Sequence, residues 1–213
     1  MKVVGILGSR NPEGQTARAA DSLLKALAGR GVEVKRVFLP AMKIERCRQC
    51  DEAGWGLCRS EGRCIIEDDF ASLAAQVRSA DAAIFATPVY FGDLSESIRA
   101  FLDRLRRIAR HADGKKGIEG KPALGICVAG GGGGGAPSCA VSLDKVLSQA
   151  TMDPLDVVPV RRQNLEMKLG VLRLTGDWLA QYLAKPRGCV TYVEASPVRR
   201  QRSADLGRQT HSP

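Results

Sequence analysis

The sequence predicts an α/β fold in which a doubly wound, five-stranded parallel sheet carries helices on both faces. Apolar runs alternate with helical patterns along the 213 residues, and this alternation is typical of strands joined by crossover helices. The runs at 3–7 and 82–86 are apolar throughout, as strands buried on both faces are. An apolar fraction of 44% is ample for one core, so we expect a single domain.

The first elements are a strand, a loop, a helix and a second strand. Residues 3–7 lead into a polar loop, and the alanine-rich stretch 16–30 then has helical character until Gly31, a residue type that ends helices. Residues 33–38 alternate between polar and apolar side chains and form the second strand. A long cysteine-bearing insertion, 40–66, follows.

The middle of the chain continues the alternation. Asp68 and Asp69 are expected as acidic charges at the start of a helix that extends to about residue 79. The third strand, 82–86, precedes a helix that begins at Ser95 and carries apolar side chains at helical spacing. The fourth strand is expected over 121–128.

The last elements are a helix, a strand and a final helix. Six consecutive glycines, 130–135, precede a helix that begins at Pro137, because proline fits the first turn of a helix. The fifth strand is expected over 155–160 and the final helix over 165–184.

The loop after the first strand has the chemistry of a phosphate site. Hydroxyl groups at Ser9 and Thr16, backbone N–H groups and the positive end of a helix dipole would meet there, which suits a terminal phosphate. The dinucleotide pattern G-x-G-x-x-G and the triphosphate pattern G-x-x-x-x-G-K-[ST] are both missing at this position. The alternative is an ordinary turn in which Ser and Thr cap the helix.

Two further loops follow the third and fourth strands and should lie at the same edge of the sheet. Residues 88–92 offer the aromatic side chains of Tyr90 and Phe91, and the glycines of 130–135 let a planar ring approach main-chain amides. Nearby N–H groups would stabilise the reduced, anionic form of a flavin ring. The three loops together favour flavin mononucleotide (FMN), whereas the alternative for the aromatic pair is core packing beside a turn.

At these motifs the sequence resembles the NAD(P)H-dependent FMN reductases and iron–sulfur flavoproteins of the flavodoxin-like superfamily. The resemblance covers roughly residues 1–184 and rests on G-S-R at 8–10 with G-Q-T at 14–16, on T-P-V-Y-F-G at 87–92 and on F-L-D-R at 101–104. It implies a flavodoxin-like sheet with strand order 2-1-3-4-5. It also implies that the three loops hold FMN through Ser9, Arg10, Gly14, Gln15, Thr16, Pro88, Val89, Tyr90, Phe91, Gly92, Gly130, Gly131 and Gly132. The first loop departs from the family's commoner pattern at Arg10 and Asn11, where Pro and Arg are usual.

The resemblance further implies an oxidoreductase that passes electrons from NAD(P)H to a quinone, a flavin or another small acceptor. No catalytic side chain is required, because the flavin carries the redox chemistry. The alternative is a non-enzymatic electron carrier of the flavodoxin or iron–sulfur flavoprotein type, although such carriers are typically acidic and this chain is basic. Family members complete their sites across a subunit interface, so a homodimer or homotetramer is expected. Trp55 and Phe91 are the candidate contact residues, unless Trp55 covers its own domain.

The insertion carries four cysteines, Cys47, Cys50, Cys58 and Cys64. Seven cysteines in a chain of this kind suit metal or redox use better than a disulfide framework. Their spacing resembles the motif that holds a [4Fe–4S] cluster in iron–sulfur flavoproteins, but that family's third cysteine falls three residues after the second, where this chain has Ala53. A cluster, zinc and free thiols remain the three alternatives. Cys127 and Cys139 are expected to pack in the core.

The formal net charge of +9 arises partly from arginines after Pro186. We divide the chain into an FMN-binding domain, 1–185, and a basic tail, 186–213, which we expect to be mobile. The tail's charge is attributed to solubility, and no nucleic-acid motif accompanies it. No run has membrane-spanning length and Met1 leads directly into a strand, so a cytoplasmic protein is expected. His111 is expected at a helix C-terminus or in solvent.

Overall fold

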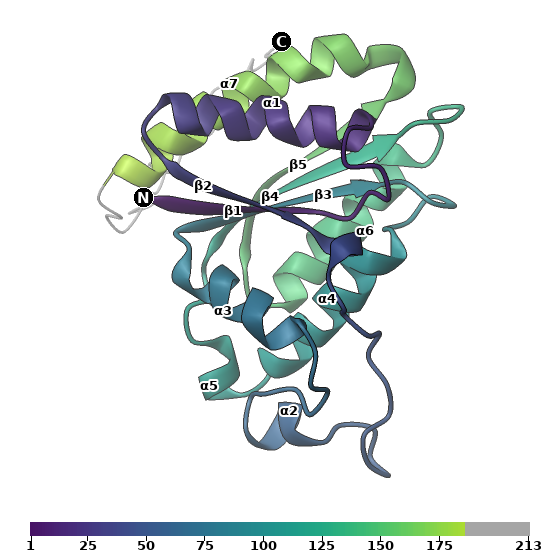
Figure 1. Ribbon diagram of the computed structural model, residues 1–213, viewed down its shortest axis with the longest axis vertical. Coiled ribbons are helices and arrows are strands. Elements are labelled where there is room, and N and C mark those ends of the chain that lie inside the picture. The colour runs from purple at the N-terminus through teal and green to yellow at the C-terminus, as the bar shows by residue number, and fades with distance from the viewer. Residues whose placement is uncertain (186–213) are drawn as a thin grey trace, which may run out of the picture.

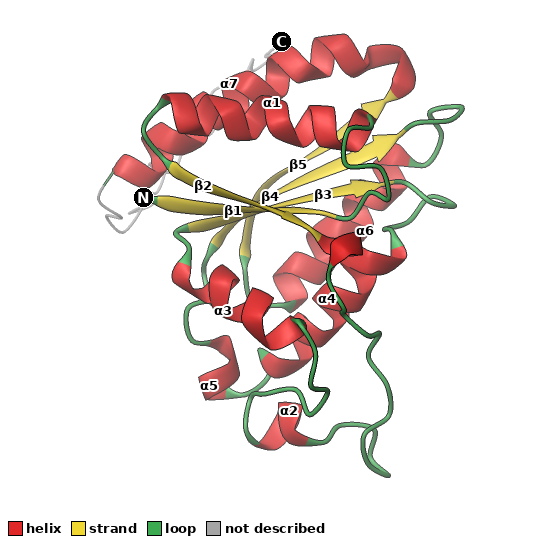
Figure 2. Ribbon diagram, viewed as in Figure 1, coloured by secondary structure: helices red, strands yellow, loops and turns green. Residues whose placement is uncertain are grey.

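The computed structural model describes residues 1–185, and the predicted tail, 186–213, lies outside the described residues. Five parallel strands form one sheet in the order β2-β1-β3-β4-β5, which confirms the predicted fold class (Figures 1 and 2). The strands are β1 (Lys2–Leu7), β2 (Glu33–Phe38), β3 (Ala82–Pro88), β4 (Pro122–Ala129) and β5 (Asp153–Arg161). The α-helices are α1 (Gln15–Gly29), α2 (Leu57–Ser60), α3 (Phe70–Ser79), α4 (Glu96–Ile108), α5 (Ala112–Lys115), α6 (Ala136–Gln149) and α7 (Leu165–Ala184). Two 3₁₀ turns, η1 (Leu39–Ala41) and η2 (Arg162–Asn164), complete the described elements.

The helices cover the sheet in two layers. Helices α1 and α7 lie on one face, and α3, α4 and α6 lie on the other (Figure 1). Strands β3 and β4 are buried along their whole length, as their continuous apolar sequences predict, while the edge strand β2 is mostly exposed. The two outer layers therefore have separate apolar cores on opposite sides of the sheet.

Helices α1 and α7 pack closely because a glycine lies between them. A Cβ atom on Gly176 would lie 2.6 Å from the backbone oxygen of Leu23 and 2.9 Å from the Cβ of Ala26. A larger residue at this position would push the two helices apart. This contact fixes α1, whose N-terminus ends the predicted phosphate loop.

Asp68 and Asp69 lie at the start of α3, as predicted, and also contact the cysteine-bearing insertion. Asp69 is the N-cap residue of α3, but its carboxylate makes no cap hydrogen bond and instead accepts one from the Lys43 N–H at 2.7 Å. Asp68 accepts the Glu45 N–H at 2.8 Å and forms a buried ion pair with Arg104. Asp68 also accepts the Phe70 N–H, at the first residue of α3, at 3.1 Å. The helix-start interpretation is therefore confirmed, and both carboxylates additionally tie the cysteine-bearing insertion to the domain.

His111 and the core cysteines complete the comparison with the sequence. The Nδ1 atom of His111 accepts a hydrogen bond from the Asp113 N–H and caps the start of the short helix α5, which the sequence did not predict. Cys127 and Cys139 are fully buried, as expected. Their mutual hydrogen bond and their burial raise the pKa of the Cys127 thiol. No helix within residues 1–185 is long and apolar enough to span a membrane.

Candidate functional site

The three predicted loops meet at the carboxyl edge of the sheet, where they project from the ends of β1, β3 and β4 at the right of Figure 1. The loops after β3 and β4 touch, since a Cβ atom on Gly135 would lie 2.6 Å from the Cα atom of Gly92. The glycine loop also reaches the first helix, because a Cβ atom on Gly130 would lie 3.4 Å from Oε1 of Gln15. Residues from all three loops are thus neighbours.

The first loop leaves several hydrogen-bonding groups free. Ser9 is buried, and its hydroxyl oxygen accepts the Asn11 N–H at 3.2 Å, so its own proton remains available. Thr16 is 4% exposed, and its hydroxyl makes no hydrogen bond within the described residues. Helix α1 has no side-chain cap, so its first N–H groups lack partners as well. Hydroxyl and N–H donors at a helix start are what a phosphate binds.

Arg10 turns toward the second loop. Its guanidinium donates to Glu96 at 3.1 Å and lies 5.6 Å from the centre of the Tyr90 ring. Both charged side chains are about three quarters exposed. Arg10 therefore connects the first loop to the ring of Tyr90, while the hydroxyl groups and the start of α1 face the predicted phosphate.

The second loop is a tight turn with an exposed aromatic side chain at its tip. Tyr90 and Asp93 exchange two backbone hydrogen bonds of 3.0 Å each, which closes the turn. Between them Phe91 has φ 51° and Gly92 has φ 80°, and positive values at both central residues are typical of a type I′ turn. Phe91 is fully exposed, although a bulky residue rarely adopts this conformation. Such an outlier supports a functional role for this loop.

The glycine loop offers an open backbone surface. An added Cβ atom at Gly131, Gly132 or Gly134 would meet no atom within 4 Å. The loop is held by Gln163, whose amide nitrogen donates to the Gly132 carbonyl at 3.1 Å. Gln163 lies in η2 after the fifth strand, and we did not single it out from the sequence, because nothing in its neighbourhood marks a site.

The side chains at this edge fit an FMN molecule. Oε1 of Gln15 is buried and has no hydrogen-bond partner among the described residues. An unpartnered buried oxygen is costly unless a ligand donates to it. This acceptor lies beside the free donors of the first loop and next to the open glycine surface, so phosphate, hydroxyl and ring contacts are all available within one edge.

Helix α4 connects this edge to the cysteine-bearing insertion. At its start, the Ser97 hydroxyl donates to the Gly8 carbonyl at 3.1 Å and the Ser95 N–H donates to the Thr87 hydroxyl at 3.0 Å. At its far end, Arg104 and Arg107 line a cavity in the insertion. Arg104 lies seven positions after Ser97 on the helix, which is a rise of roughly 10 Å.

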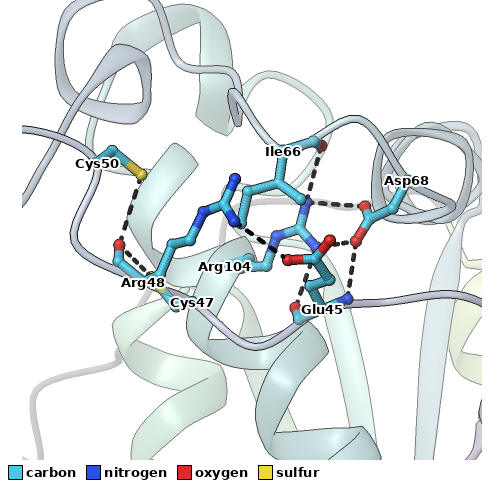
Figure 3. A network of polar contacts seen from close by, with 7 residues as sticks. All are labelled: Glu45, Cys47, Arg48, Cys50, Ile66, Asp68 and Arg104. Atoms are coloured by element: carbon cyan, nitrogen blue, oxygen red, sulfur yellow. Dashed lines mark hydrogen bonds and ion pairs between the residues drawn. The ribbon is translucent and has the colours of Figure 1, made fainter.

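That cavity, which we call the cysteine pocket, is lined by all four predicted cysteines. Its walls also include apolar and cationic side chains, and the lining residues are Cys47, Arg48, Cys50, Trp55, Cys58, Cys64, Ile65, Ile66, Arg104, Arg107 and Ile108. Cys47 and Cys50 both point toward the Arg48 carbonyl, with sulfur–oxygen distances of 3.9 and 3.5 Å (Figure 3). Burial raises the pKa of the Cys47 thiol, Arg107 opposes that shift, and the other three thiols add to it.

Arg104 holds the two ends of the cysteine-bearing insertion together. Its guanidinium binds Asp68 in a bidentate ion pair of 2.6 and 2.9 Å, and it also donates to the carbonyls of Glu45 and Ile66 (Figure 3). Glu45 precedes the first of the four cysteines and Ile66 follows the last, so one side chain fixes both ends of the cysteine-bearing segment. Burial would lower the pKa of Arg104, but hydrogen bonds to Asp68 and Cys64 outweigh it and raise that pKa.

The chemistry of the cysteine pocket fits a thiolate-bound metal centre, while its present shape is closed. Four thiols are suitable ligands for iron–sulfur clusters or zinc. Within residues 1–185, however, no three Cys, His, Asp or Glu side chains are placed to hold one ion, and the cavity is about 10 Å³, room for a single water molecule. Metal binding at Cys47, Cys50, Cys58 and Cys64 therefore requires these side chains to turn toward one point.

Trp55 is partly buried and covers its own domain, which was the alternative interpretation. Its ring packs against the apolar core and lies between two guanidinium groups, 4.1 Å from that of Arg107 and 5.6 Å from that of Arg59. Phe91 is the member of the predicted contact pair that is free to meet a partner.

The chain is similar to known FMN reductases and iron-sulfur flavoproteins. The model of a family described as NADPH-dependent FMN reductase matches residues 1–164. An iron-sulfur flavoprotein of Archaeoglobus fulgidus is 34% identical over 177 residues, which are 83% of this chain and 84% of that protein. An iron-sulfur flavoprotein of Methanocaldococcus jannaschii is 33% identical over 131 residues, or 62% of this chain. That match spans 65% of the relative's own length, and matches to two others span 46% and 52% of theirs.

Solved structures share the fold. The NAD(P)H:quinone oxidoreductase from Methanothermobacter marburgensis has a TM-score of 0.59 and 21% identity, covering 84% of this chain and 96% of that one. A flavodoxin from the domain Archaea has a TM-score of 0.57 and 12% identity, covering 87% of this chain and 100% of that one. At these identities the likeness concerns the fold.

We expect Gly131→Ala to weaken FMN binding without loss of stability. The added methyl group meets no protein atom, but it would stand where the ring approaches the backbone, and overpacking costs about 1 kcal/mol or more, roughly a fivefold loss of affinity. Fluorescence titration with FMN measures the effect. Gly29→Ala, at an equally open position at the end of α1, is the matched control. Equal FMN affinities in the two variants would contradict a ring contact at Gly131.

Proposed function

Because the chain belongs to the NADPH-dependent FMN reductase family, we propose that it is an FMN-dependent oxidoreductase that passes electrons from NAD(P)H to a quinone, a free flavin or another small acceptor. One observation carries the proposal in this chain: the buried, unpartnered Oε1 of Gln15 lies beside the free donors of the first loop and the open glycine surface. FMN carries both a phosphate and a planar ring, so it would satisfy both features at this edge.

The chain's own residues have binding and orienting roles in this proposal. The Ser9 and Thr16 hydroxyls and the start of α1 bind the phosphate, and Gln15 accepts a hydrogen bond from the cofactor. Tyr90, Phe91 and the backbone of 130–132 flank the ring, and Gln163 holds the glycine loop in position. When bound, FMN supplies hydride acceptance and electron donation, so the protein needs no side-chain base.

A non-enzymatic electron carrier is the second candidate. The archaeal flavodoxin supports it through the fold alone, whereas the chain's net charge of +9 differs from the acidic surfaces with which such carriers dock. The cytoplasm is the proposed location, because free thiols persist in a reducing compartment.

Spectroscopy and steady-state kinetics test the proposal. Protein purified without oxygen should bind FMN with one-to-one stoichiometry and show flavin absorption bands. It should then oxidise NADPH or NADH in the presence of a quinone or free FMN, with the parallel-line kinetics expected when reductant and acceptor use one ring face in turn. Bound FMN without NAD(P)H oxidation would favour the carrier, and absence of FMN binding would reject both candidates.

We also propose the cysteine pocket as the site of a metal centre, with a [4Fe–4S] cluster as the first candidate and zinc as the second. The four thiols and the names of the relatives support this proposal. Anaerobic reconstitution followed by iron, sulfide and zinc analysis tests it. Cys47→Ala and Cys58→Ala should each abolish metal binding and leave FMN binding intact. If the protein binds stoichiometric FMN but no metal under any of these conditions, the metal centre is rejected and the four cysteines are free thiols.

Self-association is proposed through α7, in addition to Phe91. One face of α7 packs on α1, while the other exposes an apolar stripe at spacings of four, three and four residues, formed by Met167, Val171, Leu174 and Trp178. This is the spacing with which two helices pack along a common seam, and a second copy of the chain offers the same seam.

We expect light scattering to give a dimer or tetramer for the wild type and a smaller mass for Leu174→Glu, because a charge in the middle of the stripe is costly to bury. Val141→Glu is the matched control, since Val141 is an exposed apolar residue on α6, away from the stripe. A single-chain mass for the wild type with full FMN occupancy would reject self-association. A mass unchanged by Leu174→Glu would reject this interface.

A further inference from the structure

Arg107 is a cation without an acidic partner in the wall of the cysteine pocket. Its guanidinium donates to the Gly54 carbonyl and stacks over Trp55, and it forms no ion pair within residues 1–185. Its neighbour in the pocket, Arg104, is neutralised by Asp68, and Arg48 lies 3.6 Å from Glu45. Among the residues that line the pocket, Arg107 is therefore the one cation without a carboxylate partner, and it lies beside the four cysteines.

The same arginine has a donor without an acceptor. The Nε atom of Arg107 is buried and has no hydrogen-bond partner among the described residues, and the Nε atom of Arg104 shares this property. An unsatisfied buried N–H is unfavourable, and more so on a charged group. Arg104 and Arg107 both line one small cavity, and an occupant that accepts hydrogen bonds and carries negative charge would satisfy such donors.

The four cysteines themselves provide such an occupant when they bind metal. Four thiolates around one divalent ion carry a net charge of about −2, and thiolate sulfur accepts hydrogen bonds. We propose that Arg107 is a positioning residue for the metal centre, whose charge offsets that of the metal–thiolate group and whose Nε–H donates to one of its sulfur atoms. This inference rests on the proposed metal centre, but not on FMN binding.

Titration of the full-length, reduced protein with Co²⁺ alone tests the inference. Cobalt bound by thiolates has intense sulfur-to-cobalt charge-transfer bands, so affinity and sulfur environment are read from one spectrum. We expect Arg107→Gln to weaken cobalt binding about tenfold to a hundredfold, the range for a hydrogen bond to a charged group. At saturation its charge-transfer band should move to lower energy, because a sulfur atom that loses a hydrogen bond gives up charge more readily.

Two further variants separate this role from a structural one. Arg106→Gln is the matched control, since Arg106 lies one position earlier on α4, pairs with Asp103 and does not line the pocket. Arg107→Lys keeps the charge and loses Nε–H, so it should recover part of the affinity and retain the band shift. If circular dichroism shows that Arg107→Gln does not fold, Arg107→Lys is measured in its place.

The outcomes are distinct. No thiolate–cobalt bands in the wild type, or equal affinities and band energies for the variants at 106 and 107, would overturn the inference. FMN titration of the same samples reports separately on the proposed enzymatic function, because cobalt binding requires no flavin. If the protein does not bind FMN but Arg107→Gln still weakens cobalt binding, the role of Arg107 stands and the proposed FMN-dependent activity is rejected.

Discussion

Arg104→Leu is expected to lower the free energy of unfolding by about 3–5 kcal/mol, the cost of removing one partner from a buried ion pair. The side chains of Arg104 and Asp68 are 1% and 7% exposed, so the carboxylate would be left without a cation in an almost dry environment. The carbonyls of Glu45 and Ile66 would lose their donor as well. Urea unfolding followed by circular dichroism measures the change.

The control for this variant is Arg106→Leu on the same helix. Arg106 forms an ion pair with Asp103, but both side chains are about one third exposed, and such pairs are worth about 1 kcal/mol or less. The double variant Asp68→Leu/Arg104→Leu should be more stable than Arg104→Leu, since no charge remains buried alone. If Arg104→Leu and Arg106→Leu lower the free energy of unfolding by similar amounts, Arg104 does not hold the two ends of the insertion together.

The ion pair also predicts how stability depends on pH. Burial raises the pKa of Asp68, but hydrogen bonds from Arg104 and from backbone N–H groups outweigh burial, so its pKa in the folded protein lies below its ordinary value. Asp68 therefore stabilises the fold above the ordinary aspartate pKa of about 4, and this stability is lost as the pH falls toward the folded-state value. In Arg104→Leu this acid-dependent step should become smaller.

Much of the fold was predictable because it depends on local patterns. Buried parallel strands have uninterrupted apolar sequences, and glycine and proline mark the ends of elements, so β1, β3, β4 and the long helices were found nearly at their observed bounds. The ends of β3 and β5 extend further than predicted. Pro88 and Pro154 lie in these extensions, and parallel pairing with β4 includes both residues, with a shift of register directly after Pro154.

Strand order predicts which loops form the site, but it does not predict the side-chain contacts that hold them. Loops that follow neighbouring parallel strands must share one edge, which is why the three loops were found. Contacts between distant segments leave no such pattern. Arg104 reaches Glu45 across 59 positions and Gln163 reaches Gly132 across 31, and nothing in the sequence near either residue reports its partner. The FMN-binding roles of the loop residues remain predictions, and Thr16 offers the most direct test of them.

Thr16→Val is expected to weaken FMN binding about tenfold to a hundredfold, because a hydrogen bond to a charged phosphate contributes about 1.5–3 kcal/mol. Thr16 is 4% exposed, and its hydroxyl makes no hydrogen bond within the described residues. Valine has nearly the same shape, so the fold should lose little stability and the measured change should concern the ligand. Titration of the apoprotein with FMN, with thermal unfolding of the unliganded protein measured in parallel, separates the two effects.

Thr175→Val is the matched control for this test. Thr175 is a helical threonine on α7 whose hydroxyl donates to the Val171 carbonyl at 3.0 Å, far from the three loops in sequence. Riboflavin, which lacks the phosphate, provides a second comparison: its affinity should be the same in the wild type and in Thr16→Val. If Thr16→Val binds FMN as tightly as Thr175→Val does, the phosphate lies elsewhere. If riboflavin and FMN lose affinity equally, Thr16 contacts another part of the cofactor.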